Sequence, residues 1–468
     1  MSQSTVPPAD LAPWGGDAAL SAWDALMWRT EADPRTSSSG FLLEMLATTP
    51  AWDDVLAAHQ RTVARIPRLR DRVVEPLQPL TQPVWSPDPD FELRRHVRRI
   101  ALPDGSDERA VLAACEELWT EPLDLRRPPW EGILVTGLAG GRAAYALRCH
   151  HALTDGTGLV QLLALAHAGG GEPSGDEAPA TSALGLTISG ALELGRRVPR
   201  LATGVARAAR EVARRRTDAV GPALDYVRSA GRILAPDSAP GSPLWRRRSA
   251  RNALLVVDID LAALRAAGRS VGGSINDAYV AAVLGGFRRY HEEHGVSVDA
   301  IPLAMPVSVR TADDAGGGNK FAGVRFAAPI GEADPAARIR AVGAFVRAAR
   351  NEPALAVMDH FSGMLGLLPT PALVEVTARL TRASDLQVSN IPGLPHGVEL
   401  AGARVERMYA LGPRPGVAAM VTLLTYDGRC GVGLTVDAEL FTDLDLLHRC
   451  LLEGFDEVGA LAGPGTSR

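Results

Sequence analysis

The sequence predicts an α/β protein built from two lobes of mixed sheet and helices, with a cleft between them. Helical and strand-like segments alternate from Leu20 to about Gly169, and they alternate again after Ala253. A long arginine-rich segment separates the two regions, and a chain of 468 residues is longer than one hydrophobic core usually supports. The predicted boundaries are 1–169 for the first lobe, 170–250 for a linker and basic helical connector, and 251–468 for the second lobe.

The first lobe is expected to contain two helices followed by two strands. Apolar residues recur at helical spacing over Asp53–Arg65 and Ala110–Trp119. Gly132–Leu138 and Ala143–Cys149 are short, mostly apolar runs typical of strands. Gly140-Gly141 lies between these runs and indicates a turn.

The segment His150-His151-Ala152-Leu153-Thr154-Asp155-Gly156 places two imidazoles and a carboxylate in one short turn. Histidine can take up and return a proton near neutral pH, so this turn is the natural position for a general base. Asp155 can cap the helix predicted to follow. Neighbouring side chains diverge there, so only one histidine is expected to face a substrate. So short a pattern also fits two hydrogen-bonded loop histidines, and the motif alone leaves that alternative open.

The segment between the lobes has two parts. Residues 169–180 are rich in Gly, Pro, Glu and Asp and predict an exposed linker. Residues 191–230 carry many arginines among alanines and valines. They fit a solvated helical connector, or a basic amphipathic face that rests on anionic lipid.

The second lobe is predicted to alternate strands with three helices. A short helix is expected at Leu261–Ala267, the strongest covers Asp277–Tyr290 after Ser274-Ile275-Asn276, and Asp443–Ala460 is the amphipathic last helix. His291-Glu292-Glu293-His294 lacks the His-Glu-x-x-His spacing and predicts a solvated helix end instead of a metal site. Strands are predicted at Leu254–Ile259, Ala304–Val309, Gly323–Pro329, Leu386–Ser389, Val417–Tyr426 and Gly431–Val436.

Composition argues against several classes of function. The net charge of −5 and the lack of a base-reading motif give no sign of a nucleic-acid partner. Four scattered cysteines form no Cys-x-x-Cys pair, so neither a zinc knuckle nor a disulfide framework is indicated. No signal peptide or membrane-spanning run is visible. We expect a cytoplasmic protein that is soluble or at most sits on a membrane surface.

Several motifs occur in a fixed order along the chain. They are Leu20–Ala25, Pro122–Asp124 with Pro128–Trp130, His150–Gly156, Asn276-Asp277, Met305–Arg310 with Gly318-Asn319, and Ser389–Gly393. With this ordered set the chain resembles, over nearly its whole length, the bacterial wax ester synthase/diacylglycerol acyltransferase family. These acyl-CoA-dependent enzymes are related in fold to chloramphenicol acetyltransferase and to peptide-synthesis condensation domains.

The resemblance implies roles for the residues of the first lobe's turn. The family's base corresponds to His151, while the role of His150 stays open. Asp155 is better interpreted as a brace for the turn, and our candidate partner for it is Arg310. Gly156 completes the motif and is a candidate substrate contact. Trp130 is expected to give structural support in the core near the acyl channel.

The resemblance also assigns candidates to the second lobe. The Asn276 amide and the helix beginning at Asp277 would polarise the thioester carbonyl across the cleft. A simple N-cap is an alternative for the same position, and both can hold together. Ser389 and Asn390 are second-tier candidates beside the tunnel. Departures from the family pattern at Pro129, Tyr279 and Trp245 are expected to alter which alcohol fits.

The function implied is transfer of a long-chain acyl group from acyl-CoA to diacylglycerol, a fatty alcohol, or both. No acyl-enzyme is expected, because the chain has no Gly-x-Ser-x-Gly elbow. Acyl-CoA and a lipid alcohol are the expected substrates, with no cofactor and no metal, and the oligomeric state stays open. A pathway-specific acyltransferase acting on a smaller alcohol or amine is the alternative enzyme. A non-catalytic protein that binds acyl lipids at a droplet surface is the third hypothesis.

Overall fold

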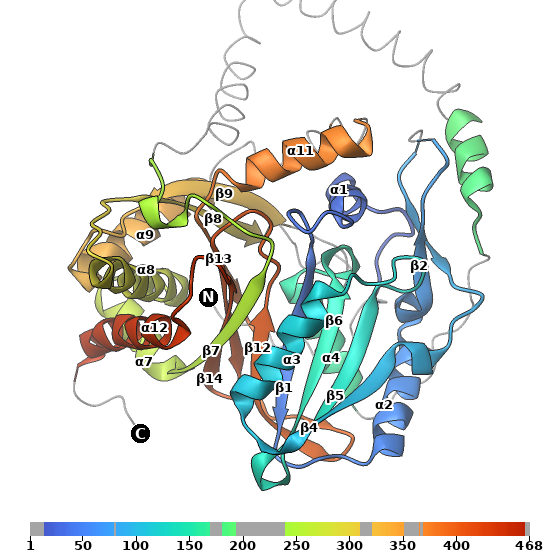
Figure 1. The fold of residues 1–468 in the computed structure, drawn as a ribbon, viewed down its shortest axis with the longest axis horizontal. Helices are drawn as coiled ribbons and strands as arrows, with labels where there is room; N and C mark the ends of the chain where they lie inside the picture. The colour runs from blue at the N-terminus through green and yellow to red at the C-terminus, as the bar shows by residue number, and fades with distance from the viewer. Residues whose placement is uncertain are drawn as a thin grey trace, which may run out of the picture.

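Two six-stranded sheets, each covered by its own helices, form the two lobes in a computed structural model (Figure 1). The structure describes residues 14–78, 81–168, 180–192, 239–308, 321–350, 365 and 368–463. The predicted linker at 169–180 and the basic connector at 191–230 therefore lie almost wholly outside the described residues. The mixed α/β architecture with two lobes is confirmed.

The first sheet has the order β11-β12-β1-β6-β5-β4. Its central strand β1 is buried along nearly its whole length and pairs antiparallel with both β6 and β12. Two-sided burial explains why Phe41–Met45 is apolar with only one acidic residue. The bounds are β11 Glu399–Leu400, β12 Ala403–Leu411, β1 Ser39–Leu46, β6 Ala143–His150, β5 Trp130–Leu138 and β4 Val97–Ser106.

The second sheet has the order β7-β14-β13-β10-β8-β9. Strand β10 is parallel to both of its neighbours, and the remaining pairs are antiparallel. The bounds are β7 Asn252–Asp260, β14 Arg429–Asp437, β13 Ala419–Tyr426, β10 Leu386–Ile391, β8 Ile301–Ser308 and β9 Phe321–Ala328; a separate hairpin joins β2 Asp71–Val74 to β3 Val84–Pro87.

Helices cover the sheets on both sides of the molecule, and α11 lies beside α1 where the lobes meet (Figure 1). The long helix α8 is almost entirely buried against α12, which explains its near-continuous apolar sequence. The bounds are α1 Ala22–Thr30, α2 Trp52–Arg65, α3 Glu108–Thr120, α4 Gly156–His167, α7 Leu261–Ser270, α8 Ile275–Glu293, α9 Pro335–Arg350, α11 Thr370–Thr381 and α12 Leu444–Gly459.

Strand β12 joins the two lobes. The sequence boundaries assign residues 399–411 to the second lobe, but β11 and β12 complete the sheet of the first. β12 also lies against β14, where a Cβ on Gly431 or Gly433 would stand 2.1 Å from the Met408 carbonyl oxygen or 2.2 Å from that of Ala410. Glycine is therefore required for this approach of two backbones, which fixes one sheet against the other.

Candidate active site

A cavity of about 280 Å³ lies between the lobes and holds the predicted catalytic turn. The first lobe contributes α1, the start of β1, the turn after β6 and the start of α4. The second lobe contributes β8, β9, β10, β13 and α11. Most of the lining is apolar, including Leu26, Met27, Leu159 and Met420. The cavity therefore suits a hydrocarbon chain with a few polar groups that hold its reactive end.

His151 faces this cavity from the end of β6. The strand ends at His150, and a single 3-10 turn over His151–Leu153 follows before α4 begins. The backbone N–H of His151 donates to the Ser38 carbonyl at 2.9 Å, which attaches the turn to the strand beside it. The His151 ring is partly exposed and lines the cavity, so it can exchange a proton with a bound hydroxyl group.

His150 has the opposite orientation and is fully buried. Its Nδ1 accepts the Ala152 backbone N–H at 2.9 Å, so the ring proton lies on Nε2, which is 3.3 Å from Oε2 of Glu31. The ring also packs edge-on against Trp28, with 5.2 Å between ring centroids. The His150 ring is therefore held inside the protein, with Nδ1 hydrogen-bonded to the turn and Nε2 in contact with the Glu31 carboxylate without a well-formed hydrogen bond.

Glu31 is a residue that the sequence analysis missed. Its carboxylate accepts hydrogen bonds from the Ser38 N–H at 2.5 Å and from the Ser39 hydroxyl at 2.6 Å, in addition to its contact with His150. Burial alone would raise the pKa of Glu31, but the His150 ring and these donors hold that pKa below its ordinary value. Glu31 thus connects the start of β1 to the catalytic turn. No sequence motif contains it.

Asp155 and Gly156 begin α4 as predicted for a cap. Oδ1 of Asp155 accepts the Gly158 N–H at 2.8 Å, and Asp155 also lines the cavity. Its expected partner Arg310 lies outside the described residues, as does Gly318-Asn319. Gly156 packs against β10, because a Cβ there would stand 2.8 Å from both Cγ1 and Cδ1 of Ile391.

Strand β10 presents alternate side chains to the cavity. Gln387, Ser389 and Ile391 line it, whereas Asn390 does not. On the neighbouring strand β13, Thr422 is the register partner of Ser389 and also lines the cavity. The Thr422 hydroxyl is buried without a hydrogen-bond partner among the described residues. Of the two second-tier candidates, only Ser389 therefore faces the cavity, and Thr422 was missed.

Asn276 and Asp277 lie at the start of α8 but do not line the cavity. Ser274 is the N-cap, and it forms a capping box with Asp277, so the expectation that Asn276 is the cap is wrong. The Asn276 amide nitrogen lies 3.7 Å from the sulfur of Met305, and Met305 is the residue that reaches the cavity. Asn276 thus contacts a residue of the cavity wall without lining the cavity itself, so the expected approach of its amide to His151 is not seen in this structure.

Three other expectations concern buried aromatic residues. Trp130 is buried in the hydrophobic core of the first lobe, where its indole N–H donates to the Leu69 carbonyl at 2.8 Å, as expected for a supporting residue. Tyr279 and Trp245 are buried in the hydrophobic core of the second lobe and do not line the cavity. The bulk at these two positions therefore fills the core, and the expectation that it shapes the tunnel is wrong.

The His291–His294 segment is not a solvated helix end throughout. His291 is buried, with Nε2 at 2.7 Å from the Ser242 hydroxyl and Nδ1 at 2.7 Å from the Phe287 carbonyl oxygen. His291 therefore attaches α8 to the segment that enters the second lobe. Among the described residues no group of three metal-ligating side chains is present. In that same part of the chain, none of the helices has the length and apolar character needed to cross a membrane.

Comparison with known proteins identifies sequence relatives along most of the chain. The model of the wax ester synthase/diacylglycerol acyltransferase catalytic domain matches residues 20–279, and that of the WS/DGAT C-terminal domain matches residues 317–459. A protein of Mycobacterium tuberculosis strain H37Rv, named as a candidate diacylglycerol O-acyltransferase, is 40% identical over 451 residues. The match covers 94% of this chain and 91% of that relative.

Solved structures share the fold. The wax ester synthase/diacylglycerol acyltransferase from Marinobacter aquaeolei VT8 aligns with a TM-score of 0.59 at 20% identity, over 95% of this chain and 100% of that chain. The first condensation domain of the calcium-dependent antibiotic synthetase aligns with a TM-score of 0.61 at 17% identity, over 96% and 97% of the two chains. These alignments confirm the predicted two-lobed fold.

Proposed function

This chain belongs to the wax ester synthase/diacylglycerol acyltransferase family, and we propose that it transfers a long-chain acyl group from acyl-CoA to diacylglycerol or a fatty alcohol, with His151 as the general base. The observation that carries this proposal is the placement of His151 in a largely apolar cavity between the lobes. Such a cavity can take an acyl chain and an alcohol while it excludes most water.

The reaction needs one proton acceptor. His151 removes the proton from the acceptor hydroxyl as its oxygen attacks the thioester carbonyl, which gives a tetrahedral intermediate. Collapse of this intermediate breaks the C–S bond, and His151 returns the proton to the departing thiolate. The products are an ester and free coenzyme A, and the histidine regains its starting form without an acyl-enzyme.

The neighbouring residues act through position. His150 and Glu31 hold the backbone of the turn, because the ring of His150 accepts the Ala152 N–H and contacts the Glu31 carboxylate. Asp155 caps α4 and would be braced by Arg310. Ser389 lies on the cavity side of β10, and its hydroxyl can donate a hydrogen bond to the thioester carbonyl oxygen.

A membrane or lipid-droplet surface is the proposed working location, since the acceptor is a lipid. The helix at residues 183–192 supports this, because its large apolar side chains Leu184, Ile188 and Leu192 are 59%, 53% and 59% exposed. Their spacing of four residues puts them on one face. The Thr187 hydroxyl accepts the Leu77 N–H at 2.8 Å, which holds the helix against the lobe. An apolar face of this kind can enter the headgroup region of a lipid layer.

The activity is tested with purified protein, labelled palmitoyl-CoA and a panel of diacylglycerol, hexadecanol and short alcohols. His151→Ala should lower transfer by roughly 10²–10⁴-fold, the range expected for a general base. His396→Ala is the matched control, since His396 is exposed and does not line the cavity. Transfer that survives the His151 change would overturn the mechanism, and turnover confined to short alcohols would overturn the acceptor class.

A further inference from the structure

A groove of about 530 Å³ opens on the second lobe where the chain enters it from the connector. Its lining includes four arginines, Arg246, Arg247, Arg248 and Arg382, together with one acidic side chain, Asp385. The groove is thus strongly basic on a protein whose net charge is −5.

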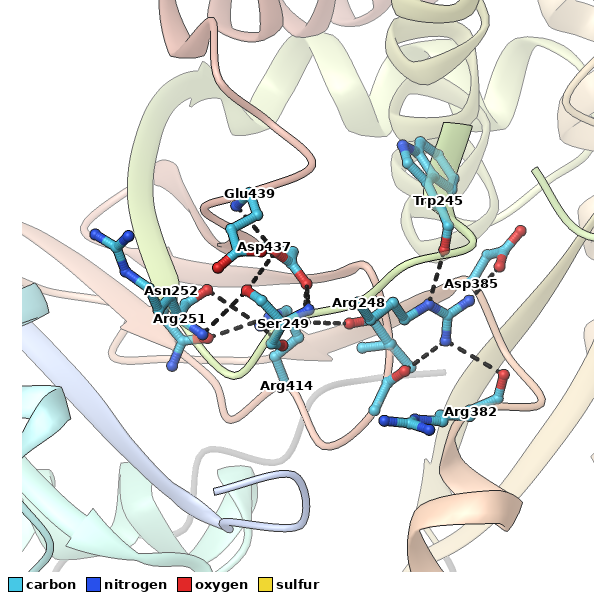
Figure 2. Close-up of polar contacts among 12 residues, drawn as sticks. Trp245, Arg248, Ser249, Arg251, Asn252, Arg382, Asp385, Arg414, Asp437 and Glu439 are labelled. Atoms are coloured by element: carbon cyan, nitrogen blue, oxygen red, sulfur yellow. Dashed lines mark hydrogen bonds and ion pairs between the residues drawn. The ribbon is translucent and has the colours of Figure 1, made fainter. Parts of the chain in front are cut away.

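Arg248 neutralises the acid and holds the walls of the groove together. Its guanidinium pairs with Asp385 and donates to the carbonyl of Trp245 at 3.2 Å (Figure 2). It also donates to the carbonyl of Ser384 at 2.7 Å. Asp385 also accepts the Ser242 N–H at 2.5 Å. The carboxylate is therefore satisfied inside the protein and does not cancel the charge of the other arginines.

Three cations remain available to a ligand. Arg246, Arg247 and Arg382 are exposed, and no ion pair engages them within the described part of the chain. Arg382 gives its backbone carbonyl to Arg248 at 3.2 Å, which fixes the position of its Cα (Figure 2). Guanidinium groups on a fixed backbone are well suited to phosphate oxygens.

One loop separates this groove from the acyl cavity. Thr381 and Ser384 line the cavity, whereas Arg382, Ala383 and Asp385 line the groove. A ligand whose anionic end lies in the groove therefore needs only to pass this loop to bring its other end into the cavity.

We propose that Arg246, Arg247 and Arg382 form a phosphate-binding subsite for the nucleotide end of the acyl-CoA donor. This inference rests on the proposed function. Coenzyme A carries a pyrophosphate and a 3′-phosphate at one end and its thiol at the end of a flexible arm. The groove takes the phosphates, the arm passes the Thr381–Asp385 loop, and the thioester enters the cavity that contains His151.

The test compares donors with and without phosphates. Octanoyl-CoA and octanoyl-N-acetylcysteamine carry the same acyl group, but only the first carries phosphates. In the double variant Arg246→Gln/Arg247→Gln, kcat/KM should fall roughly tenfold for octanoyl-CoA, since charge-assisted hydrogen bonds are lost, and should not change for octanoyl-N-acetylcysteamine. Arg265→Gln/Arg269→Gln on α7 is the control with the same charge change outside the groove, and it should change neither value. An equal effect on both donors, or an equal effect of the two double variants, would overturn the inference.

Calorimetric titration with free coenzyme A gives a second readout that needs no turnover. The groove variant should weaken binding roughly tenfold, whereas the α7 variant should not. Binding through the arginines without any acyl transfer would contradict the proposed function alone. Transfer and binding that ignore these arginines would contradict the subsite alone. If the arginines govern recovery on phosphatidylglycerol vesicles but not coenzyme A binding, the phosphates recognised are those of lipids, and the donor assignment is wrong.

Discussion

Replacing Gly156 with alanine is expected to disturb the contact between the catalytic turn and the second lobe. The added Cβ would lie 2.8 Å from two side-chain carbons of Ile391, whereas carbon atoms pack best at about 3.5–4.0 Å. Ile391 is buried, so α4 and β10 must separate by about 1 Å. Overpacking of this kind costs about 1–3 kcal/mol, and the better helix propensity of alanine returns at most about 1 kcal/mol. The net expectation is a loss of about 1–2 kcal/mol in the free energy of unfolding.

A double-mutant cycle tests this reasoning by urea unfolding. Ile391→Ala removes both clashing carbons and costs about 2–5 kcal/mol by itself. In that background Gly156→Ala should become neutral or stabilising, and kcat/KM should recover part of the loss that misplacement of the turn causes. Gly459→Ala at the end of α12 is the control, because a Cβ there meets nothing within 4 Å. Equal effects of Gly156→Ala in both backgrounds would refute the proposed contact.

Three further predictions concern titratable groups with shifted pKa values. The pKa of Glu31 is lowered in the folded protein, so the stability that its carboxylate contributes is present above about pH 4.5 and is lost as the pH falls through the folded-state pKa. When the urea midpoint is plotted against pH, Glu31→Gln should therefore show a smaller loss of stability at acid pH than the unmodified protein. An unchanged loss at acid pH would contradict this prediction. Burial opposes the charge on His167, but Glu44, 3.0 Å from Nε2, raises the net pKa above 6.5. The stability contributed by the His167–Glu44 pair is therefore complete below pH 6.5 and is lost as the pH rises through the folded-state pKa of His167. The urea midpoint should fall over this pH range in the unmodified protein but not in His167→Gln, and an equal fall in both would refute the assignment. Burial raises the pKa of Cys149 to about 12, so iodoacetamide at pH 7.5 should label this cavity-lining thiol only in denaturant, and rapid native labelling seen by mass spectrometry would count against it.

The strands that link the lobes could not be predicted from the sequence. β12 contains Glu406 and Arg407, so local alternation did not identify it, and the apolar run of β1 was also missed. The strand accommodates the charge of Arg407 because its guanidinium pairs with Glu108 at 2.7 Å and with Asp258 at 3.0 Å. One partner lies in each lobe. Such a strand depends on residues far away in the chain, and no local pattern contains that information.

Only part of the candidate site could likewise be predicted from the sequence. The motif identified the turn of His151, because a doubled histidine followed by a helix cap is a local signal. It could not identify Glu31, Thr422 or the groove arginines, which come from separate segments brought together by folding. Asn276 was placed at the site by its motif, but it does not line the cavity and contacts Met305, which does.

The sequence by itself determined the family, the two-lobed α/β class and the turn that carries His151, since each depends on an ordered set of short motifs. Only the tertiary structure decided which histidine is buried against Glu31, which face of β10 lines the cavity, and where four arginines gather in one groove. These features depend on side-chain direction and on contacts between distant segments. Contacts between distant segments form only in the folded chain, so local sequence patterns do not predict them.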